Sequence, residues 1–141
     1  HKPVGSTTGH ALAPSSPLQE ARLADTSRRF DICKQAILDK DFDTFAEVVE
    51  EDSTIMHSVM MTSNPPLFYW APTSLHLMKV IPEWRRNGIP VCFTLDAGAN
   101  VHAITTQKYA QTVEESLLAV SGVKSVLRSK PGGGTHLCIK K

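Results

Sequence analysis

Two consecutive prolines, Pro65 and Pro66, place the strongest single constraint on how this chain can fold. Proline fixes the backbone φ angle and has no N–H to donate, so residues 62–66 can lie neither inside a helix nor in a central strand. The segment must therefore be a loop. Before it, apolar residues recur at the spacing of amphipathic helices, which we expect over about residues 17–39 and from residue 42 past residue 56.

Polar residues mark the ends of these two helices. Ser15 or Ser16 can cap the first, whose first turn holds Pro17, and segment 25–27 can break it in two. Asp41 suits the N-cap of the second helix, which packs back on the first.

Helices and strand candidates both follow the proline loop. Thr73 or Ser74 can cap a third helix, which Asn87-Gly88 ends in a left-handed conformation. We further expect strands over 90–95 and 101–105, a fourth helix over 106–120, and an antiparallel pair over 123–129 and 135–139. Because helices and strands do not strictly alternate, the sequence predicts an α+β fold, an antiparallel sheet with helices on one face.

Length and composition bound the functions that remain open. The chain has 141 residues, which suits one domain over 1–141, and it is 41% apolar. Its formal net charge of +1 gives no bulk electrostatic reason to expect a nucleic-acid partner, although a local basic patch stays possible. No apolar run reaches the roughly 20 residues of a membrane span, and no signal peptide opens the chain. Three widely separated cysteines argue against a disulfide scaffold or a zinc ribbon and favour the cytoplasm.

The first candidate site is the segment Gly5-Ser6-Thr7-Thr8-Gly9, which follows the end of a short strand expected at residues 1–4. Glycines let backbone N–H groups approach an anion and hydroxyls add donors, so a loop of this composition can hold a phosphate. It lacks the lysine of a P-loop, and an ordinary surface turn explains the composition equally well.

The second candidate site is Asp96, in Leu95-Asp96-Ala97-Gly98-Ala99-Asn100. An apolar strand precedes it, so Asp96 sits where a strand ends and the chain turns. A carboxylate in that place can act as general base, metal ligand or turn-former. Asp and Asn are also common turn residues, so the spacing alone leaves these alternatives open.

Other polar residues carry weaker signals. Six histidines show none of the paired spacings of a zinc site, and His57 is better interpreted as a buried, hydrogen-bonded residue than as a ligand. Residues 131–134 suit a hairpin turn, with closure over a ligand as the alternative. Arg85-Arg86 suits a solvated helix end.

Several motifs together carry a resemblance to a known family. They are Gly5-Ser6-Thr7-Thr8-Gly9, Asp41-Phe42-Asp43-Thr44-Phe45-Ala46, Asp52-Ser53-x-x-x-His57, Pro65-Pro66-Leu67-Phe68-Tyr69 and Thr94-Leu95-Asp96-Ala97-Gly98-Ala99-Asn100. In this order and spacing they resemble the C-terminal half of the diphosphomevalonate decarboxylases, in the GHMP superfamily. The glycine turn at 131–134 fits the last hairpin of that family. The resemblance implies the ferredoxin-like α+β fold of the superfamily's second domain.

The resemblance also implies site residues and a reaction. The family's enzymes use ATP and Mg²⁺ to phosphorylate the 3-hydroxyl of mevalonate diphosphate, after which phosphate and CO₂ leave and isopentenyl diphosphate remains. Asp96 matches the catalytic aspartate, and Ser6 matches a serine that contacts the substrate near its carboxylate and 3-hydroxyl. Thr7 matches a position that touches the diphosphate, while Gly5 and Ala97 would offer only backbone groups.

Partners follow from the same resemblance. The family binds ATP and Mg²⁺ mainly through an N-terminal half that this sequence does not contain. We therefore expect a C-terminal domain that pairs with such a half, forms a homodimer, and does not turn over substrate alone. His57 matches a family histidine on the helix behind the site and is expected to give structural support.

Two residues depart from the family pattern. Ala99 stands where the family usually has Pro, and His10 where it commonly has Met. Both lie beside the substrate loops, and relatives in the superfamily decarboxylate mevalonate monophosphate or phosphorylate mevalonate without decarboxylating it. A non-catalytic interaction module, with both loops as ordinary turns, is the rival interpretation. The relative placement of Ser6 and Asp96 in the fold discriminates between the two.

Overall fold

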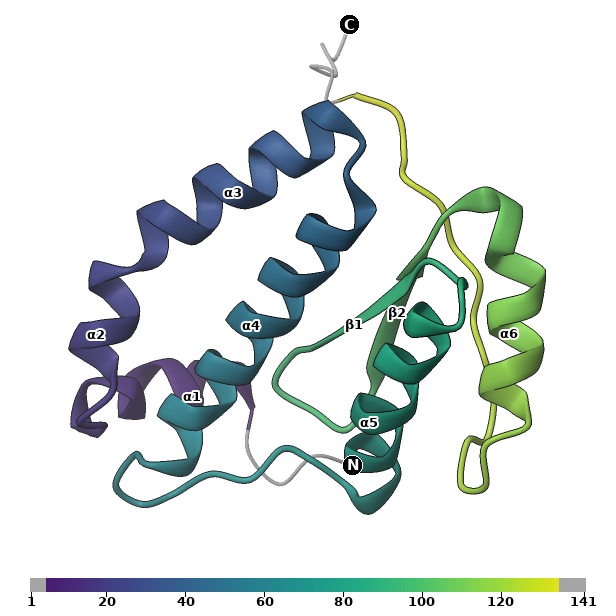
Figure 1. Ribbon diagram of the computed structural model, residues 1–141. Helices are drawn as coiled ribbons and strands as arrows, with labels where there is room; N and C mark the ends of the chain where they lie inside the picture. The colour runs from purple at the N-terminus through teal and green to yellow at the C-terminus, as the bar shows by residue number, and fades with distance from the viewer. Residues whose placement is uncertain (1–4, 135–141) are drawn as a thin grey trace, which may run out of the picture.

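Helices make up most of the computed structural model, which describes residues 5–134 (Figure 1). Before the proline loop lie α1 (Ser6–Leu12), the short 3₁₀ turn η1 (Ala13–Ser15), α2 (Gln19–Ala24), α3 (Thr26–Asp39) and α4 (Phe42–Met61). After it come α5 (Pro72–Arg86), β1 (Val91–Leu95), β2 (Val101–Thr105), the 3₁₀ turn η2 (Gln107–Tyr109) and α6 (Ala110–Leu118). The break expected at 25–27 is confirmed, because Asp25 separates α2 from α3.

A tight connection turns α3 back into α4, as the sequence predicts. Lys40 adopts the left-handed conformation with φ of 58°, and Asp41 follows as N-cap. The Asp41 carboxylate accepts a hydrogen bond from the Thr44 amide at 3.1 Å, which satisfies one of the free N–H groups of the first turn of α4. The two helices therefore run back along each other and pack closely.

The expectation of a loop over residues 5–9 is wrong, because Ser6 begins an α-helix and Gly5 is its N-cap. Gly9 lies inside this helix, and a Cβ atom built on it would be 2.8 Å from the Tyr69 hydroxyl oxygen. Gly9 is therefore used for close approach to Tyr69 and not for a turn. The expected cap of α5 is also wrong by two or three residues, since Pro72 occupies the first turn and Ala71 is the N-cap.

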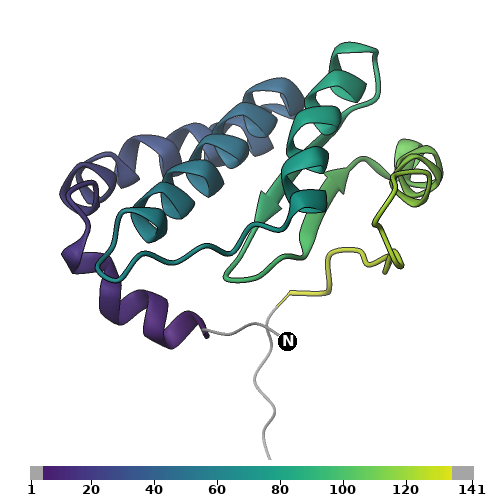
Figure 2. The ribbon, with the colours of Figure 1, turned by 90° about the horizontal axis from the view of Figure 1, so that it is seen from below.

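The predicted hairpin of β1 and β2 is confirmed as an antiparallel pair. Val91 faces Thr105 and Leu95 faces Val101. Figure 2 shows α3, α4 and α5 as a layer on one side of this hairpin, so the predicted α+β class with helices on one face is confirmed. The main core is made by α5, β1 and α6 together; its buried residues are Leu77, Ile81, Val91, Phe93, Leu95, Val113 and Leu117.

The predicted strand at 123–129 is wrong, because the described chain there is irregular. This segment attaches through side chains, since Val123 and Val126 pack against the main core and Arg128 contacts Gln111 and Glu114 of α6. Its predicted partner at 135–139 and the strand end predicted at residues 1–4 lie outside the described residues.

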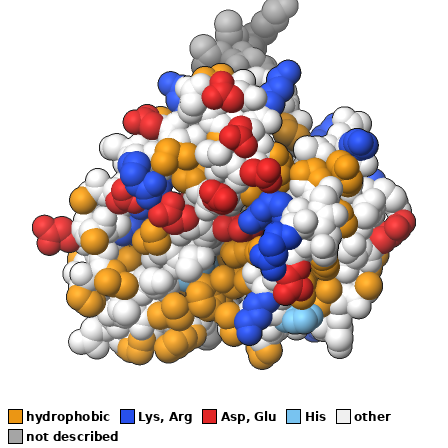
Figure 3. All heavy atoms as spheres, viewed as in Figure 1, with side chains coloured by type: hydrophobic (Ala, Val, Ile, Leu, Met, Phe, Trp, Pro, Cys, Tyr) orange, Lys and Arg blue, Asp and Glu red, His pale blue; other side chains and the backbone are white. Residues whose placement is uncertain are grey.

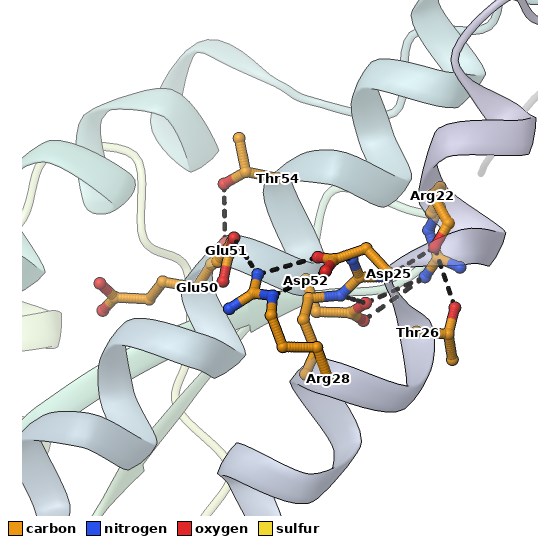
Figure 4. A network of polar contacts seen from close by, with 9 residues as sticks. Arg22, Asp25, Thr26, Arg28, Glu50, Glu51, Asp52 and Thr54 are labelled. Atoms are coloured by element: carbon orange, nitrogen blue, oxygen red, sulfur yellow. Dashed lines mark hydrogen bonds and ion pairs between the residues drawn. The ribbon is translucent and has the colours of Figure 1, made fainter.

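Ion pairs fasten α2 and α3 to α4 (Figure 4). Arg29 donates to Asp25 at 2.7 Å and to Asp52 at 3.0 Å, and Arg22 donates to Asp52 at 3.2 Å. The side chain of Arg29 is only 4% exposed, whereas that of Arg28, which pairs with Asp25, is 49% exposed. The hydrogen bond from Arg28 lowers the pKa of Asp25 to about 2, so this carboxylate is charged at neutral pH.

Candidate active site

The turn between β1 and β2 presents an acidic side chain to solvent. Asp96 directly follows Leu95, the last residue of β1, and its side chain is 88% exposed. The imidazole of His102 on β2 lies beside it, with its Nε2 atom 3.6 Å from Oδ2 of Asp96. Both side chains are exposed, so this contact is weakened by solvent. The carboxylate of Asp96 is therefore accessible to a ligand.

The residue before Asp96 is held by buried polar side chains of α4. The Leu95 amide donates to the Ser53 hydroxyl at 3.0 Å, and the His57 Nε2 atom lies 3.3 Å from the Leu95 carbonyl oxygen. Ser53 and His57 are 3% and 1% exposed. Burial lowers the pKa of His57, outweighing the Leu95 carbonyl and the Asp96 carboxylate, which raise it. His57 is thus neutral at neutral pH and donates Nε2–H to the carbonyl.

The other end of the same turn is held by α5. The buried Ser74 hydroxyl donates to the Ala99 carbonyl at 2.7 Å, and within the turn the Gly98 amide donates to the Asp96 carbonyl at 2.7 Å. Both ends of the turn are therefore fixed by hydroxyl groups from helices. The position of Asp96 depends on the packing of α4 and α5, not on the turn sequence alone.

The first candidate segment lies at the same end of the molecule. The N-terminus of α1 and the β1–β2 turn are close together in both ribbon views (Figures 1 and 2). The Tyr69 hydroxyl reaches the Gly5 carbonyl at 3.5 Å, a long hydrogen bond, and the Tyr69 ring meets the His57 ring edge-on at 6.0 Å. Ala97 packs against a second, small core, whose buried residues are Ala13, Val59, Met60, Leu67 and Tyr69. A chain of contacts thus joins Gly5 to the turn of Asp96.

Ser6 and Thr7 are exposed in the first turn of α1, so their side chains, like that of Asp96, are accessible. Placement of the two segments on opposite faces would exclude the catalytic interpretation, and their position at the same end of the molecule is compatible with it. The catalytic and binding roles of Asp96, Ser6, Gly5, Thr7 and Ala97 remain predictions.

Sequence reasoning missed three residues of this region. Ser53 belongs to one of the motifs that carry the family resemblance, but no role was predicted for it. His102 was considered only as a possible zinc ligand. The signal for His102 was available, because a five-residue connection between antiparallel strands brings the start of the second strand back to the end of the first. Tyr69 gave no such signal, since its contact with Gly5 joins residues 64 positions apart.

Two hollows on the surface lie away from this turn. One, of about 230 Å³, lies between the end of α3, the start of α4 and Thr106. The other, of about 470 Å³, lies between α4 and α5; it is lined by Asp43, Glu47, Pro82, Arg85 and Arg86. On the face drawn in Figure 3, acidic and basic side chains are intermixed, so no patch of a single charge sign dominates that face.

Within residues 5–134, histidine, cysteine, aspartate and glutamate nowhere form a group of three that could hold a metal ion. Of the helices described, none combines the length and the apolar character needed to cross a membrane.

Comparison with known proteins identifies the family. Residues 1–134 match the model of the family described as "Mevalonate 5-diphosphate decarboxylase C-terminal domain". The chain belongs to this family. It is 39% identical over 101 residues to the diphosphomevalonate decarboxylase of Candida albicans, covering 70% of this chain and 28% of the relative. It is 32% identical over 120 residues to the phosphomevalonate decarboxylase of Haloferax volcanii, covering 83% and 37%.

Solved structures of decarboxylases of this family share the fold. The mevalonate diphosphate decarboxylase from Staphylococcus aureus superposes with a TM-score of 0.79 at 34% identity, covering 84% of this chain and 36% of that one. A structure described as "MDDEF in complex with MVAPP, AMPPCP and Magnesium" gives a TM-score of 0.80 at 28% identity, covering 88% and 38%. The chain spans about a third of the length of the relatives it matches.

Proposed function

We propose that this chain works as the C-terminal domain of an ATP-dependent decarboxylase that converts mevalonate diphosphate into isopentenyl diphosphate. Family membership supports the reaction class. The observation that carries the proposal in this chain is the Asp96 carboxylate, 88% exposed on a turn whose flanking residues are held by buried side chains. An exposed carboxylate on a firmly held backbone can orient a ligand hydroxyl and accept its proton.

The first step is phosphoryl transfer from ATP to the 3-hydroxyl oxygen of the substrate. Asp96 orients this hydroxyl and accepts its proton as the oxygen bonds to the γ-phosphorus and the ADP oxygen leaves. Ser6 contacts the substrate near its carboxylate and 3-hydroxyl. Because the transition state of such a transfer is loose, positioning matters as much as the basicity of Asp96.

The second step is elimination. The bond between C3 and the phosphorylated oxygen breaks, the bond between the carboxylate carbon and C2 supplies the electron pair of the new double bond, and phosphate and CO₂ leave. The Asp96 proton is returned to solvent afterwards.

Binding groups and partners complete the proposal. Thr7 would contact the diphosphate, with Gly5 and Ala97 offering backbone groups. ATP and Mg²⁺ would be held mainly by an N-terminal half of the same enzyme. The related structure described with AMPPCP and magnesium supports the use of ATP and Mg²⁺. We also propose a homodimer in the cytoplasm. Among the described cysteines, Cys33 and Cys92 are both free thiols, as a reducing compartment favours.

A second substrate has its own support. The Haloferax volcanii relative, at 32% identity, is a phosphomevalonate decarboxylase. Asp96 would perform the same step on that substrate, and the difference would lie in how many phosphates the contacts around Thr7 hold.

The deciding experiment offers mevalonate, its 5-phosphate and its 5-diphosphate in turn to the full-length gene product with ATP and Mg²⁺, and measures CO₂ release. We expect release from the diphosphate, at a kcat/KM well above that for the monophosphate. Preference for the monophosphate selects the second substrate. Absence of CO₂ from all three, with or without ATP consumption, contradicts the proposed decarboxylation.

A further inference from the structure

The edge of β1 that faces away from β2 is covered by side chains of α4 and α5. Backbone groups of alternate residues point to the same edge of a strand, and Val91, Phe93 and Leu95 point theirs away from β2. The Phe93 amide donates to Glu50 at 3.3 Å, and Arg85 donates to the Val91 carbonyl at 2.8 Å. Side chains therefore hydrogen-bond the groups that a neighbouring strand would otherwise pair.

Of these three residues of β1, Leu95 has the most hydrogen bonds with side chains of the helices. The Leu95 amide donates to the Ser53 hydroxyl at 3.0 Å, and this hydroxyl also lies 3.4 Å from the Leu95 carbonyl oxygen. His57 donates to the same carbonyl at 3.3 Å. Ser53 and His57 are four residues apart, so they lie on one face of α4. Both groups of one residue, its N–H and its C=O, are thus bound to the same helix.

We propose that Ser53 and His57 are positioning residues, which hold the Leu95 peptide so that the Asp96 carboxylate is placed for reaction. The proposal rests on the proposed function. Neither side chain is exposed, so neither is offered to substrate, and their contacts end on the backbone of the residue that precedes Asp96. The Leu95 carbonyl carbon is bonded to the Asp96 nitrogen, so fixing this carbonyl fixes the peptide plane from which Asp96 projects.

The physical reason is the steep dependence of rate on placement. A displacement of about 1 Å at a reacting group can cost roughly 100-fold in rate. The strand ends at Leu95, and the turn beyond it is bonded by the Gly98 amide to the Asp96 carbonyl and by the Ser74 hydroxyl to the Ala99 carbonyl. Without the two α4 side chains, Leu95 would keep its packing in the core but lose the side-chain hydrogen bonds to its amide and its carbonyl.

The first test compares two buried serines in the full-length enzyme. Ser53→Ala removes the partner of the Leu95 amide, whereas Ser16→Ala removes a buried hydroxyl that contacts Thr62 and the Leu18 amide, away from β1. At a temperature well below both melting points, we expect Ser53→Ala to lower kcat by about 10-fold or more with KM changed by less than about 3-fold. Ser16→Ala should leave kcat unchanged.

The second test separates the hydrogen bond of His57 from its packing. His57→Gln keeps an N–H donor of similar reach, whereas His57→Met fills a similar volume without one. We expect the Gln variant to stay within about 3-fold of wild-type kcat and the Met variant to fall about 10-fold. Equal kcat in the two variants overturns the positioning role of His57.

The third test needs no substrate, so it separates this proposal from the proposed function. Amide hydrogen exchange is measured at Leu95 and Gly98 in wild type, Ser53→Ala and Ser16→Ala. Loss of a buried hydrogen bond should speed exchange at both amides by about 10-fold or more in Ser53→Ala only. Unchanged exchange in Ser53→Ala overturns the proposal. So does faster exchange with wild-type kcat, because the bond would then hold the turn without placing Asp96 for reaction.

If the wild-type enzyme releases no CO₂ from any mevalonate substrate, the proposed function fails. The exchange result then decides the structural claim by itself. Faster exchange at Leu95 and Gly98 supports α4 as the holder of the turn, and unchanged exchange refutes it.

Discussion

Asp96 combines an exposed side chain with a backbone that is held from two helices, and this combination can be tested by one substitution. Asp96→Asn keeps the size of the side chain and most of its hydrogen-bonding geometry but removes the charge and the basicity. In the full-length enzyme, we expect kcat to fall by about 10² to 10⁴, the range for lost general-base catalysis, and KM to change far less.

The value of kcat decides between a base and a turn-former, and the melting temperature of the same preparation shows whether the fold is intact. Asn is an equally good turn residue, so stability should be unchanged. Asp31→Asn, an exposed aspartate on α3, is the matched control and should keep wild-type kcat. A stable and fully active Asp96→Asn enzyme would remove Asp96 from the mechanism.

Gly9 is a second residue whose role follows from local geometry. A methyl group at this position would lie 2.8 Å from the Tyr69 hydroxyl and 3.3 Å from the Met60 sulfur, both within the small core. Gly9→Ala should therefore lower the free energy of unfolding by about 1–3 kcal/mol through overpacking. Gly5→Ala meets no atom within 4 Å and serves as the control in thermal melts. Equal melting temperatures for the two variants would show that α1 does not pack on Tyr69.

At the scale of the element, α4 is joined to α2 and α3 by the ion pairs of Figure 4. The burial of each pair determines how much it contributes to the free energy of unfolding. Arg29→Met removes a buried guanidinium that donates to Asp25, Asp52 and the Arg22 carbonyl. We expect a loss of about 1–3 kcal/mol in unfolding free energy, measured by denaturant titration.

Arg28→Met is the matched control on the same helix. Arg28 also binds Asp25 and reaches Glu51, but its side chain is half exposed and solvent weakens such pairs. Its effect should be clearly smaller than that of Arg29→Met. A larger effect of Arg28→Met would mean that burial does not rank these pairs.

Elements set by local chemistry could be predicted from the sequence. The N-cap Asp41 could be predicted from its position before an amphipathic run alone. Strand β1 could be predicted from its apolar run and the turn after it. Helix α1 could not be predicted, because its Gly/Ser/Thr composition suits a loop and its stability depends on contacts with distant Tyr69. The prediction of a strand over 123–129 was wrong for a similar reason, since the valines of this segment pack on a core instead of forming a strand.

At the scale of the whole molecule, the candidate site joins segments that are far apart in the sequence. The position of Asp96 after an apolar strand could be read directly. The support from Ser53 could not, because it requires knowing which face of α4 meets which edge of β1, a tertiary arrangement that no local pattern contains. The nearness of α1 to the turn likewise depends on Tyr69 and became visible only in the fold.

The buried histidine makes the stability of the fold depend on pH. Burial lowers the pKa of His57 below its ordinary value of 6.5; the groups facing it are the Leu95 carbonyl, the Asp96 carboxylate and the rings of Tyr69 and Trp70. The unfolded chain therefore binds a proton more readily than the folded one. The contribution of the neutral, buried His57 to the free energy of unfolding is therefore complete above pH 6.5 and is lost as the pH falls below this value.

Thermal melts between pH 7.5 and 5.0 check this expectation. The melting temperature of the wild-type protein should fall more steeply over this range than that of His57→Gln, which cannot take up a proton. Parallel curves would show that His57 is not the group responsible.

Activity is also a property of the whole molecule. The purified 141-residue chain should show no ATP-dependent decarboxylation, because the proposed nucleotide site lies in the N-terminal half. The assay is CO₂ release with all three mevalonate substrates. Turnover at a normal kcat, about 1 to 1,000 per second, would contradict this division of the site.

The side chains that cover the outer edge of β1 also limit how this protein can associate with other strands. An open strand edge recruits extended chain from other molecules and can start aggregation, but here Glu50, Ser53, His57 and Arg85 already bind the Val91 carbonyl, the Phe93 amide and both backbone groups of Leu95. The outer edge of β1 is therefore the less favourable side for extending the hairpin. We expect a strand added to this sheet, from the same polypeptide or another, to join across β2.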